Sequence, residues 1–282
     1  NYALAYAGMA EYYWVSAFWG FMVPKEALAK AKSAALAALK LDDSLAEVHA
    51  ISGVVLGTGD FDWVGAEQEF RRALELNPAS PIVHFSYGNF CLRPMRRLEE
   101  ALSQLQRAVE LDPLSALYNA GLGYVYGVTG QHDLAIAQHR RTMDLDPGVY
   151  VPHWLLAIAH GHMGRFEEAI AAAQKACELS GRSALTLGVL AWAYGVAGRQ
   201  GEARALLEEL ATQCCTTYVP AVALAPAHMG LGEIDQALEC VEKGVEERDL
   251  QLICGLKSEP VFAPLHGHPR YQALLRKMNL EP

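Results

Sequence analysis

Residues 116–147, ALYNAGLGYVYGVTGQHDLAIAQHRRTMDLDP, decide the fold of this chain. In the first half, small and apolar side chains recur at helical spacing until Gly130 interrupts them. A second helical pattern begins near Leu134 and continues through Thr142. Asp146-Pro147 then ends it, because proline cannot continue a helix. The stretch therefore predicts two helices joined by a tight turn.

The same pattern recurs along the chain with a period of 34 or 35 residues. One column contains only alanine: Ala31, Ala66, Ala101, Ala135, Ala169, Ala203 and Ala237. A second contains only alanine or glycine: Ala10, Gly53, Gly88, Gly123, Ala157, Ala191 and Ala225. Such small residues let paired helices approach more closely than the usual distance of about 8–10 Å. We therefore expect a bulky residue at Gly123 or Ala135 to cost more than one on an outer face.

These residues resemble the tetratricopeptide repeat, a helix–turn–helix unit of about 34 residues. The matching pieces are Leu122-Gly123-x-x-Tyr126, Ala135 and Leu145-Asp146-Pro147. Further matches are Phe166-Glu167-Glu168-Ala169-Ile170 with Ala176, and Leu190-Ala191-x-x-Tyr194 with Ala203. The resemblance implies an all-α fold, an α–α superhelix or solenoid of about seven helix–turn–helix repeats with a C-terminal capping helix.

The period divides the chain into a solenoid over residues 1–249 and a C-terminal segment over residues 250–282. The seven predicted repeats cover residues 1–43, 44–78, 79–113, 114–147, 148–181, 182–215 and 216–249. In the last segment, Tyr271, Leu274, Leu275 and Met278 form one apolar stripe on a short helix. Because a solenoid needs a cap over its last exposed face, we expect residues 250–282 to be that cap.

Three repeats carry additional residues. Repeat one has nine more between its two small-residue columns, and they include several aromatic side chains: Trp14, Phe18, Trp19 and Phe21. We interpret them as part of an elongated first helix that packs on the repeat's own second helix or on a repeat outside this sequence; a ligand site is the alternative. Repeats two and three each have one extra residue, which we place in the turns at 60–63 and 93–95, with Trp63 as a core anchor.

Composition excludes several classes of protein. The chain has 52% hydrophobic and 20% charged residues, which is too apolar for a disordered chain. Its formal net charge of −9 argues against nucleic acid and anionic membranes as partners. The uncharged stretches 12–24, 183–198 and 214–232 are too short for a membrane span or are broken by proline and glycine.

The six cysteines occur without a CxxC pair or zinc-ligand spacing. We expect free thiols that pack as small hydrophobic side chains, which suits a reducing cytoplasm. The sequence opens on Asn1 inside a predicted repeat, and we expect it to be a piece of a longer protein.

Each first helix presents two faces when successive residues are rotated by about 100°. In tetratricopeptide solenoids one of these faces lines a concave groove, and here it is an apolar and aromatic stripe. The stripe consists of Phe85, Asn89, Leu117, Tyr124, Trp154, Ile158, His162, Trp192 and Met229. In one interpretation a tightly wound superhelix buries the stripe between first helices. In the other, the stripe binds an apolar peptide or helix.

No motif indicates catalysis or a bound metal. His160 and His162 point about 200° apart on a helix, and His266 and His268 have no Asp, Glu or Cys within five residues on either side. There is no GxSxG, phosphate loop or GxGxxG motif. We therefore predict no enzymatic activity, no cofactor and no metal. The stripe also contains no lysine, so it lacks the clamp with which related solenoids bind the C-terminal carboxylate of heat-shock chaperones.

Two segments are similar to the C-terminal repeat regions of large bacterial signalling proteins, in which the repeats follow a winged-helix regulator, a nucleotide cyclase or a Ser/Thr kinase domain. The segments are Phe61-Asp62-Trp63 with residues 69–78, and residues 269–275. We predict a non-catalytic cytoplasmic scaffold that binds a protein or peptide in its groove, with neither nucleic acid nor membrane as partner. The alternative is a structural module that self-associates by stacking through its aromatic first repeat.

Overall fold

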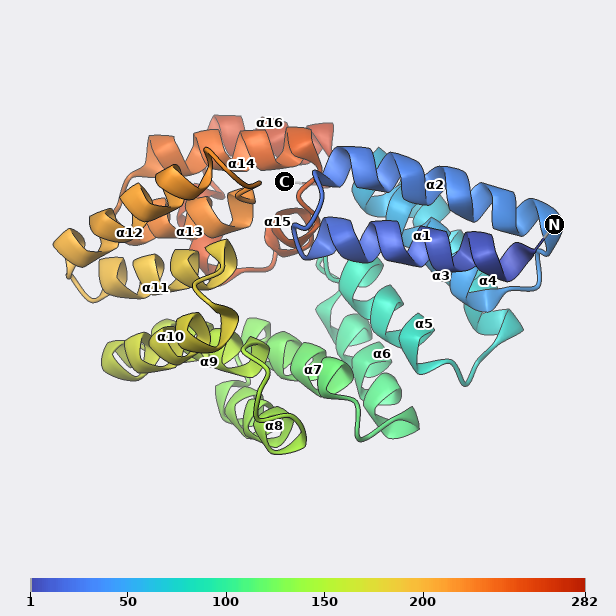
Figure 1. The fold of residues 1–282 in the computed structure, drawn as a ribbon, viewed down its shortest axis with the longest axis horizontal. Coiled ribbons are helices and arrows are strands. Elements are labelled where there is room, and N and C mark those ends of the chain that lie inside the picture. The colour runs from blue at the N-terminus through green and yellow to red at the C-terminus, as the bar shows by residue number, and fades with distance from the viewer. Residues whose placement is uncertain (1, 282) are drawn as a thin grey trace. The chain divides into compact units, whose positions relative to one another are not determined.

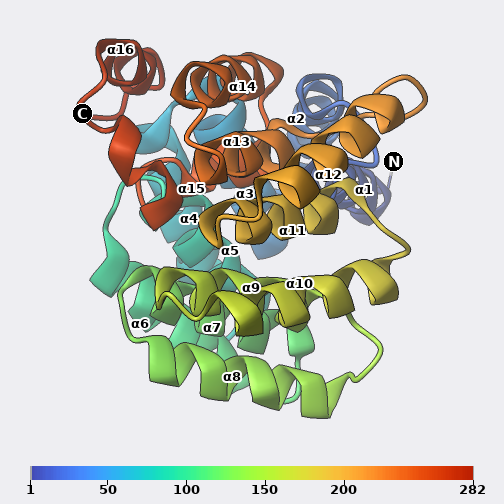
Figure 2. The same ribbon diagram turned by 90° about the vertical axis from the view of Figure 1, so that its left-hand side faces the viewer.

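The computed structural model describes residues 2–281, and every regular element in that range is a helix (Figures 1 and 2). Seven helix pairs follow one another along the chain. They are α1 (Ala3–Phe18) and α2 (Pro24–Leu41), α3 (Ala46–Val54) and α4 (Trp63–Leu76), α5 (Pro81–Tyr87) and α6 (Leu98–Leu111), α7 (Ala116–Val128) and α8 (His132–Leu145), α9 (Val151–His162) and α10 (Phe166–Ser180), α11 (Ala184–Val196) and α12 (Gln200–Gln213), and α13 (Ala221–Gly230) and α14 (Ile234–Glu247). The predicted all-α class with helix–turn–helix repeats is confirmed.

Three short helices complete the chain: α15 (Leu250–Gly255), the 3₁₀ helix η3 (Pro260–Leu265) and α16 (Pro269–Lys277). Contacts between Cα atoms divide the described residues into two compact units. The first compact unit consists of residues 2–113, 245–258 and 273–281, and the second of residues 114–244 and 259–272. Repeats one to three thus belong to the first compact unit, and repeats four to seven, up to residue 244, to the second.

The alanine column lies at the buried contact within each helix pair. All seven of its alanines have an exposed fraction of 0%. The small-residue column faces the same contact, because a Cβ atom added at Gly123 on α7 would lie 2.6 Å from Cε1 of His139 on α8. At Gly53 on α3 it would lie 2.7 Å from Cε2 of Phe70 on α4. The close approach of paired helices therefore requires these small side chains.

Repeats two and three absorb their extra residue inside the first helix. The π-helical segments η1 (Val55–Asp60) and η2 (Gly88–Leu92) directly continue α3 and α5. In η2 the Arg93 N–H donates to the Gly88 carbonyl five residues earlier, at 3.0 Å, which is the hydrogen bond of a π turn. The sequence predicts these residues in the following turns; the predicted repeats are correct, but the predicted element is wrong.

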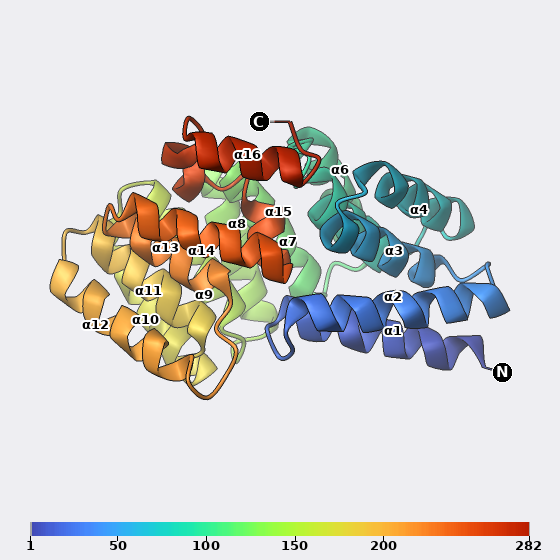
Figure 3. The same ribbon diagram turned by 90° about the horizontal axis from the view of Figure 1, so that it is seen from above.

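Aromatic side chains of α1 fill the core of the first compact unit. Trp14 and Phe18 pack edge-on against Phe90 of η2, with ring centroids 5.3 and 5.4 Å apart. Figure 3 shows α1 and α2 side by side, and Phe21, in the turn between them, is 79% exposed. The aromatic side chains of repeat one therefore reach beyond α2, the second helix of their own repeat, to repeat three.

The end of the chain also packs inside the first compact unit. The Trp63 indole Nε1–H donates to the Met278 carbonyl at 2.7 Å, and the Asn279 amide donates to the Phe61 carbonyl at 3.1 Å. Gln251 of α15 donates to the Phe18 carbonyl at 2.8 Å. Trp63 is only 4% exposed, so it serves as the expected core anchor. Residues 250–258 and 273–281 are thus held by repeats one to three of this unit.

Candidate functional site

The nine stripe residues lie on the first helices of repeats three to seven, as expected from their period, and the two compact units divide them. Phe85 and Asn89, on α5 and η2, belong to the first compact unit and are 7% and 5% exposed. The Asn89 side-chain amide donates to the Phe85 carbonyl at 3.2 Å, and the Phe85 ring lies 6.4 Å from that of Phe90. An incoming peptide would reach these two side chains only after their neighbours move.

The other seven stripe residues belong to the second compact unit, where we call them the first-helix face. They are Leu117 and Tyr124 on α7, Trp154, Ile158 and His162 on α9, Trp192 on α11 and Met229 on α13. Trp192 is buried and Leu117 is 45% exposed, whereas the remaining five are half-buried. Such a face offers apolar contacts to a ligand while the core beneath it stays buried.

Trp192 connects α9 and α11 at the centre of this face. Its ring lies so close to Gly161 that a Cβ atom there would come within 2.6 Å of Cζ3, so a larger residue at this position would force the ring to move. The ring also meets the His162 imidazole edge-on, with centroids 5.5 Å apart. Trp154 and Ile158 pack against the same hydrophobic cluster. The first helices of neighbouring repeats are therefore joined by aromatic and aliphatic contacts along the face.

Burial lowers the pKa of two histidines in this region. Burial, together with nearby His132, lowers the pKa of His162 to about 4. Burial alone lowers the pKa of His139 to about 3. His162 therefore adds no positive charge to the first-helix face near pH 7, and the contacts that the face offers a ligand are mainly apolar.

Two polar atoms on the face have no hydrogen-bond partner among residues 2–281. They are Nε1 of Trp154 and Nε2 of His162. An indole N–H can only donate, and the Trp154 Nε1 atom is itself buried, so a carbonyl of a bound peptide would reach it only after neighbouring side chains move. A buried donor without an acceptor costs about 1–3 kcal/mol, so a ligand that supplies one gains affinity.

Residues from the end of the chain lie against this face. Glu259 lines a gap together with Tyr124, Ile158 and His162, and the free volume of that gap is about 10 Å³. This volume is close to the minimum for one water molecule. Val261 packs against the hydrophobic cluster of Trp192, and η3 contacts α13. Sequence reasoning missed this contact, because no local pattern in residues 259–261 indicates which helices they touch.

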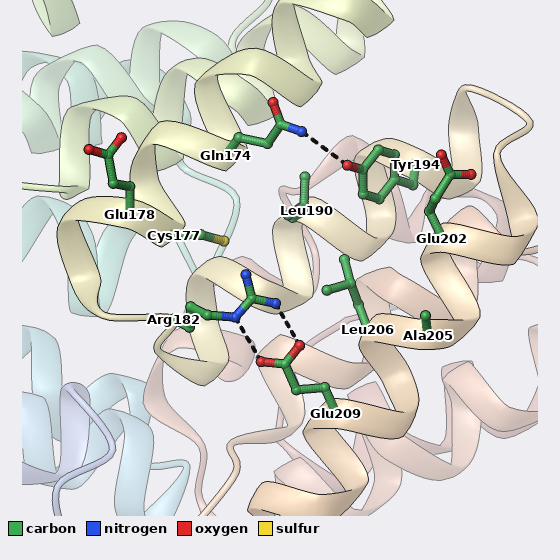
Figure 4. Close-up of a pocket in the computed structure, with 10 residues that line it drawn as sticks. All are labelled: Gln174, Cys177, Glu178, Arg182, Leu190, Tyr194, Glu202, Ala205, Leu206 and Glu209. Atoms are coloured by element: carbon green, nitrogen blue, oxygen red, sulfur yellow. Dashed lines mark hydrogen bonds and ion pairs between the residues drawn. The ribbon is translucent and has the colours of Figure 1, made fainter.

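A second recess, which the sequence did not indicate, lies between α10 and α12 (Figure 4). Its volume is about 540 Å³, and Cys177, Leu190 and Leu206 give it an apolar floor. On its rim Arg182 makes a two-point ion pair with Glu209, with N···O distances of 2.9 and 2.6 Å. The repeat period identifies positions that face the core. It gives no sign that two charged residues 27 positions apart meet on the surface.

The described residues hold no cluster of three His, Cys, Asp or Glu side chains placed to bind a metal ion. All six cysteines are free, and Cys91, Cys177 and Cys254 are buried as expected, whereas Cys214 and Cys215 are exposed. Within residues 2–281 no helix combines the length and apolar character that crossing a membrane requires.

Models of the tetratricopeptide repeat family match residues 95–149 and residues 152–182. This part of the chain therefore contains tetratricopeptide repeats. Solved structures resemble the fold over most of the chain. The protein is similar to PilF of Pseudomonas aeruginosa, with a TM-score of 0.57 and 20% identity over 83% of this chain and 96% of that one.

It is also similar to PilW, described as a widely conserved type IV pilus biogenesis factor, with a TM-score of 0.61 and 18% identity over 82% of this chain and 97% of that one. A tetratricopeptide repeat protein of Parabacteroides merdae gives a TM-score of 0.59 and 15% identity over 89% of this chain and 99% of that one. At these identities the likeness shows the fold. The comparison with curated proteins gave no match.

Proposed function

We propose that this protein is a non-catalytic interaction scaffold that binds a peptide or helix of a partner protein on the first-helix face of its second compact unit. Tetratricopeptide repeats generally mediate protein–protein interactions. The observation that carries the proposal is the half-buried row of Tyr124, Trp154, Ile158 and His162, with an indole donor that lacks an acceptor. Aromatic side chains of this kind dominate binding energy at interfaces.

The experiment starts from peptides selected by display on the intact chain, whose affinities are then measured by isothermal titration. We expect Trp154→Ala to weaken binding at least tenfold, because a central aromatic contact contributes about 2 kcal/mol or more. The matched control is Leu134→Ala, since Leu134 is an apolar residue on the second helix α8 with 49% exposure. Equal affinities of the wild type, Trp154→Ala and Leu134→Ala would refute binding at the first-helix face.

The wider setting that we propose is the sensing or regulatory region of a bacterial signalling protein in the cytoplasm. It is supported by the similarity of residues 61–63, 69–78 and 269–275 to such repeat regions. The six free thiols are compatible with a reducing compartment.

Self-association through repeat one is a second candidate function, favoured by exposed apolar side chains at this end of the chain. Tyr2, Leu4, Met9, Tyr12 and Phe21 have exposed fractions of 47–79%. Contiguous exposed apolar residues are typical of interaction surfaces. Sedimentation velocity over a range of concentrations would detect a dimer, and Tyr12→Glu should dissociate it whereas Leu114→Glu, at a 73% exposed site, should not. A monomer at every concentration would refute this candidate.

A further inference from the structure

We infer that residues 259–262, Glu-Pro-Val-Phe, occupy the first-helix face as an intramolecular ligand. The face then takes an external peptide of the same chemistry, an acidic residue followed by proline and two apolar residues. This inference rests on the proposed function, because it names the ligand class of the same face.

The contacts of the segment support this assignment. Glu259 lines the gap beside Tyr124 and His162, which are two of the predicted binding residues. Val261 packs against the cluster that contains Trp192 and that Trp154 and Ile158 border. A single short segment therefore touches the face with one acidic and one apolar side chain, in alternate positions.

The conformation of the segment is that of a small preformed ligand. Residues 260–265 form a 3₁₀ helix, and its turns are closed by internal bonds from the Phe262 N–H to the Glu259 carbonyl at 3.1 Å and from the His266 N–H to the Ala263 carbonyl at 3.2 Å. Prolines at 260 and 264 restrict the backbone, which lowers the entropy lost on binding. A free peptide with this sequence can therefore adopt the same turn.

The segment buries one side of its turn and exposes the other, as a docked ligand requires. Phe262 and Leu265 are 2% and 0% exposed, whereas Pro260, Ala263 and Pro264 face solvent. Ala263 thus provides a position in the same turn at which a charge can be added without touching the face.

An intramolecular ligand lowers the apparent affinity for an external one. The apparent dissociation constant is the intrinsic one divided by the fraction of molecules with an open face. If the segment is seated in about 90–99% of molecules, its release tightens external binding by roughly ten- to a hundredfold. Val261 is the residue to change, because a carboxylate cannot replace its apolar contact and should release the segment.

The probe is a fluorescein-labelled peptide with the sequence of residues 257–268, KSEPVFAPLHGH, titrated into the full chain by fluorescence anisotropy. We expect Val261→Glu to bind it at least tenfold more tightly than the wild type does, and Ala263→Glu to bind it as the wild type does. A peptide with Glu in place of the valine should not bind the Val261→Glu chain.

Equal affinities of the wild type, Val261→Glu and Ala263→Glu for the peptide would overturn the inference. If Val261→Glu fails to fold by circular dichroism, Val261→Ala replaces it, with an expected gain of at least twofold and no gain as the contradicting result. Peptides selected by display distinguish failure of this inference from failure of the proposed function. If they bind in a Trp154-dependent way while the variants at Val261 change nothing, only the inference fails. If neither they nor the peptide of residues 257–268 bind, the proposed function fails as well.

Discussion

Gly195→Ala tests the close approach of α11 and α13, the helices that present Trp192 and Met229. A Cβ atom at Gly195 would lie 2.6 Å from the carbonyl carbon of Gly230 and 2.7 Å from its oxygen. Both are backbone atoms, so no side-chain rotation relieves the overlap. Because ordinary contacts of this kind begin at 3.4 Å, the two helices must separate by close to an ångström.

Two opposing terms set the size of the effect. Overpacking of a tight contact costs about 1–3 kcal/mol. Alanine is favoured over glycine inside a helix by about 0.5–1 kcal/mol, which offsets part of that cost. The free energy of unfolding should therefore fall by roughly 0.5–2 kcal/mol. With about 2–4 °C of melting temperature per kcal/mol for large domains, this corresponds to a loss of several degrees.

Thermal unfolding followed by far-UV circular dichroism measures the loss. The matched controls are Gly8→Ala in α1 and Gly201→Ala in α12, because an added Cβ atom there meets nothing within 4 Å. Both should keep or raise the melting temperature, since they gain helix propensity without overlap. A melting temperature of Gly195→Ala equal to or above that of Gly201→Ala would refute the argument from close backbone approach.

Three further changes test other parts of the structure. The pKa of His139 is lowered to about 3 by burial, so the unfolded chain binds one more proton below about pH 6.5 and stability falls as the pH drops, by up to about 1.4 kcal/mol per pH unit. Between about pH 7 and pH 5, the midpoint of urea unfolding should therefore fall less for His139→Leu than for the wild type. An equal fall in both proteins would contradict this. Asn119→Ala should cost about 1–3 kcal/mol in urea unfolding, because Asn119 is 0% exposed and accepts a hydrogen bond from Gln138; an unchanged midpoint would count against a structural role. Trp63→Phe removes the hydrogen bond to the Met278 carbonyl, so hydrogen exchange of residues 278–281 should accelerate; unchanged exchange would show that other contacts hold these residues.

The fold could be predicted from the sequence because its decisive residues repeat. Seven alanines at nearly constant spacing can be recognised without any structure, and all seven prove to be fully buried. Residues that occur once give no such signal. The extra residues of repeats two and three show the limit, because a period reveals that a residue is inserted but not which hydrogen bonds shift to accommodate it. A π turn at Val55–Asp60 and a longer loop have the same period.

The candidate site was less predictable because contacts between distant segments decide it. The sequence placed the nine stripe residues on the first helices, which is where they lie, but their exposure depends on what covers them. The sequence predicts that residues 259–261 belong to a cap, but it does not predict that Glu259 lies beside Tyr124 and His162. Nothing in the spacing of Glu259 and Tyr124, which are far apart in the chain, encodes that contact.

The aromatic residues added to repeat one explain why the two halves of the stripe differ. Phe85 and Asn89 occupy the same register as Trp154 and Ile158, yet the first two are buried and the second two are half-buried. Trp14 and Phe18 supply the difference, because they pack on Phe90, which in turn lies beside Phe85. The longer α1 therefore covers the stripe residues of the first compact unit with aromatic side chains of the chain itself. In the second compact unit no first helix carries such an extension, so the corresponding residues keep part of their surface, and a short proline-bounded segment is enough to contact them.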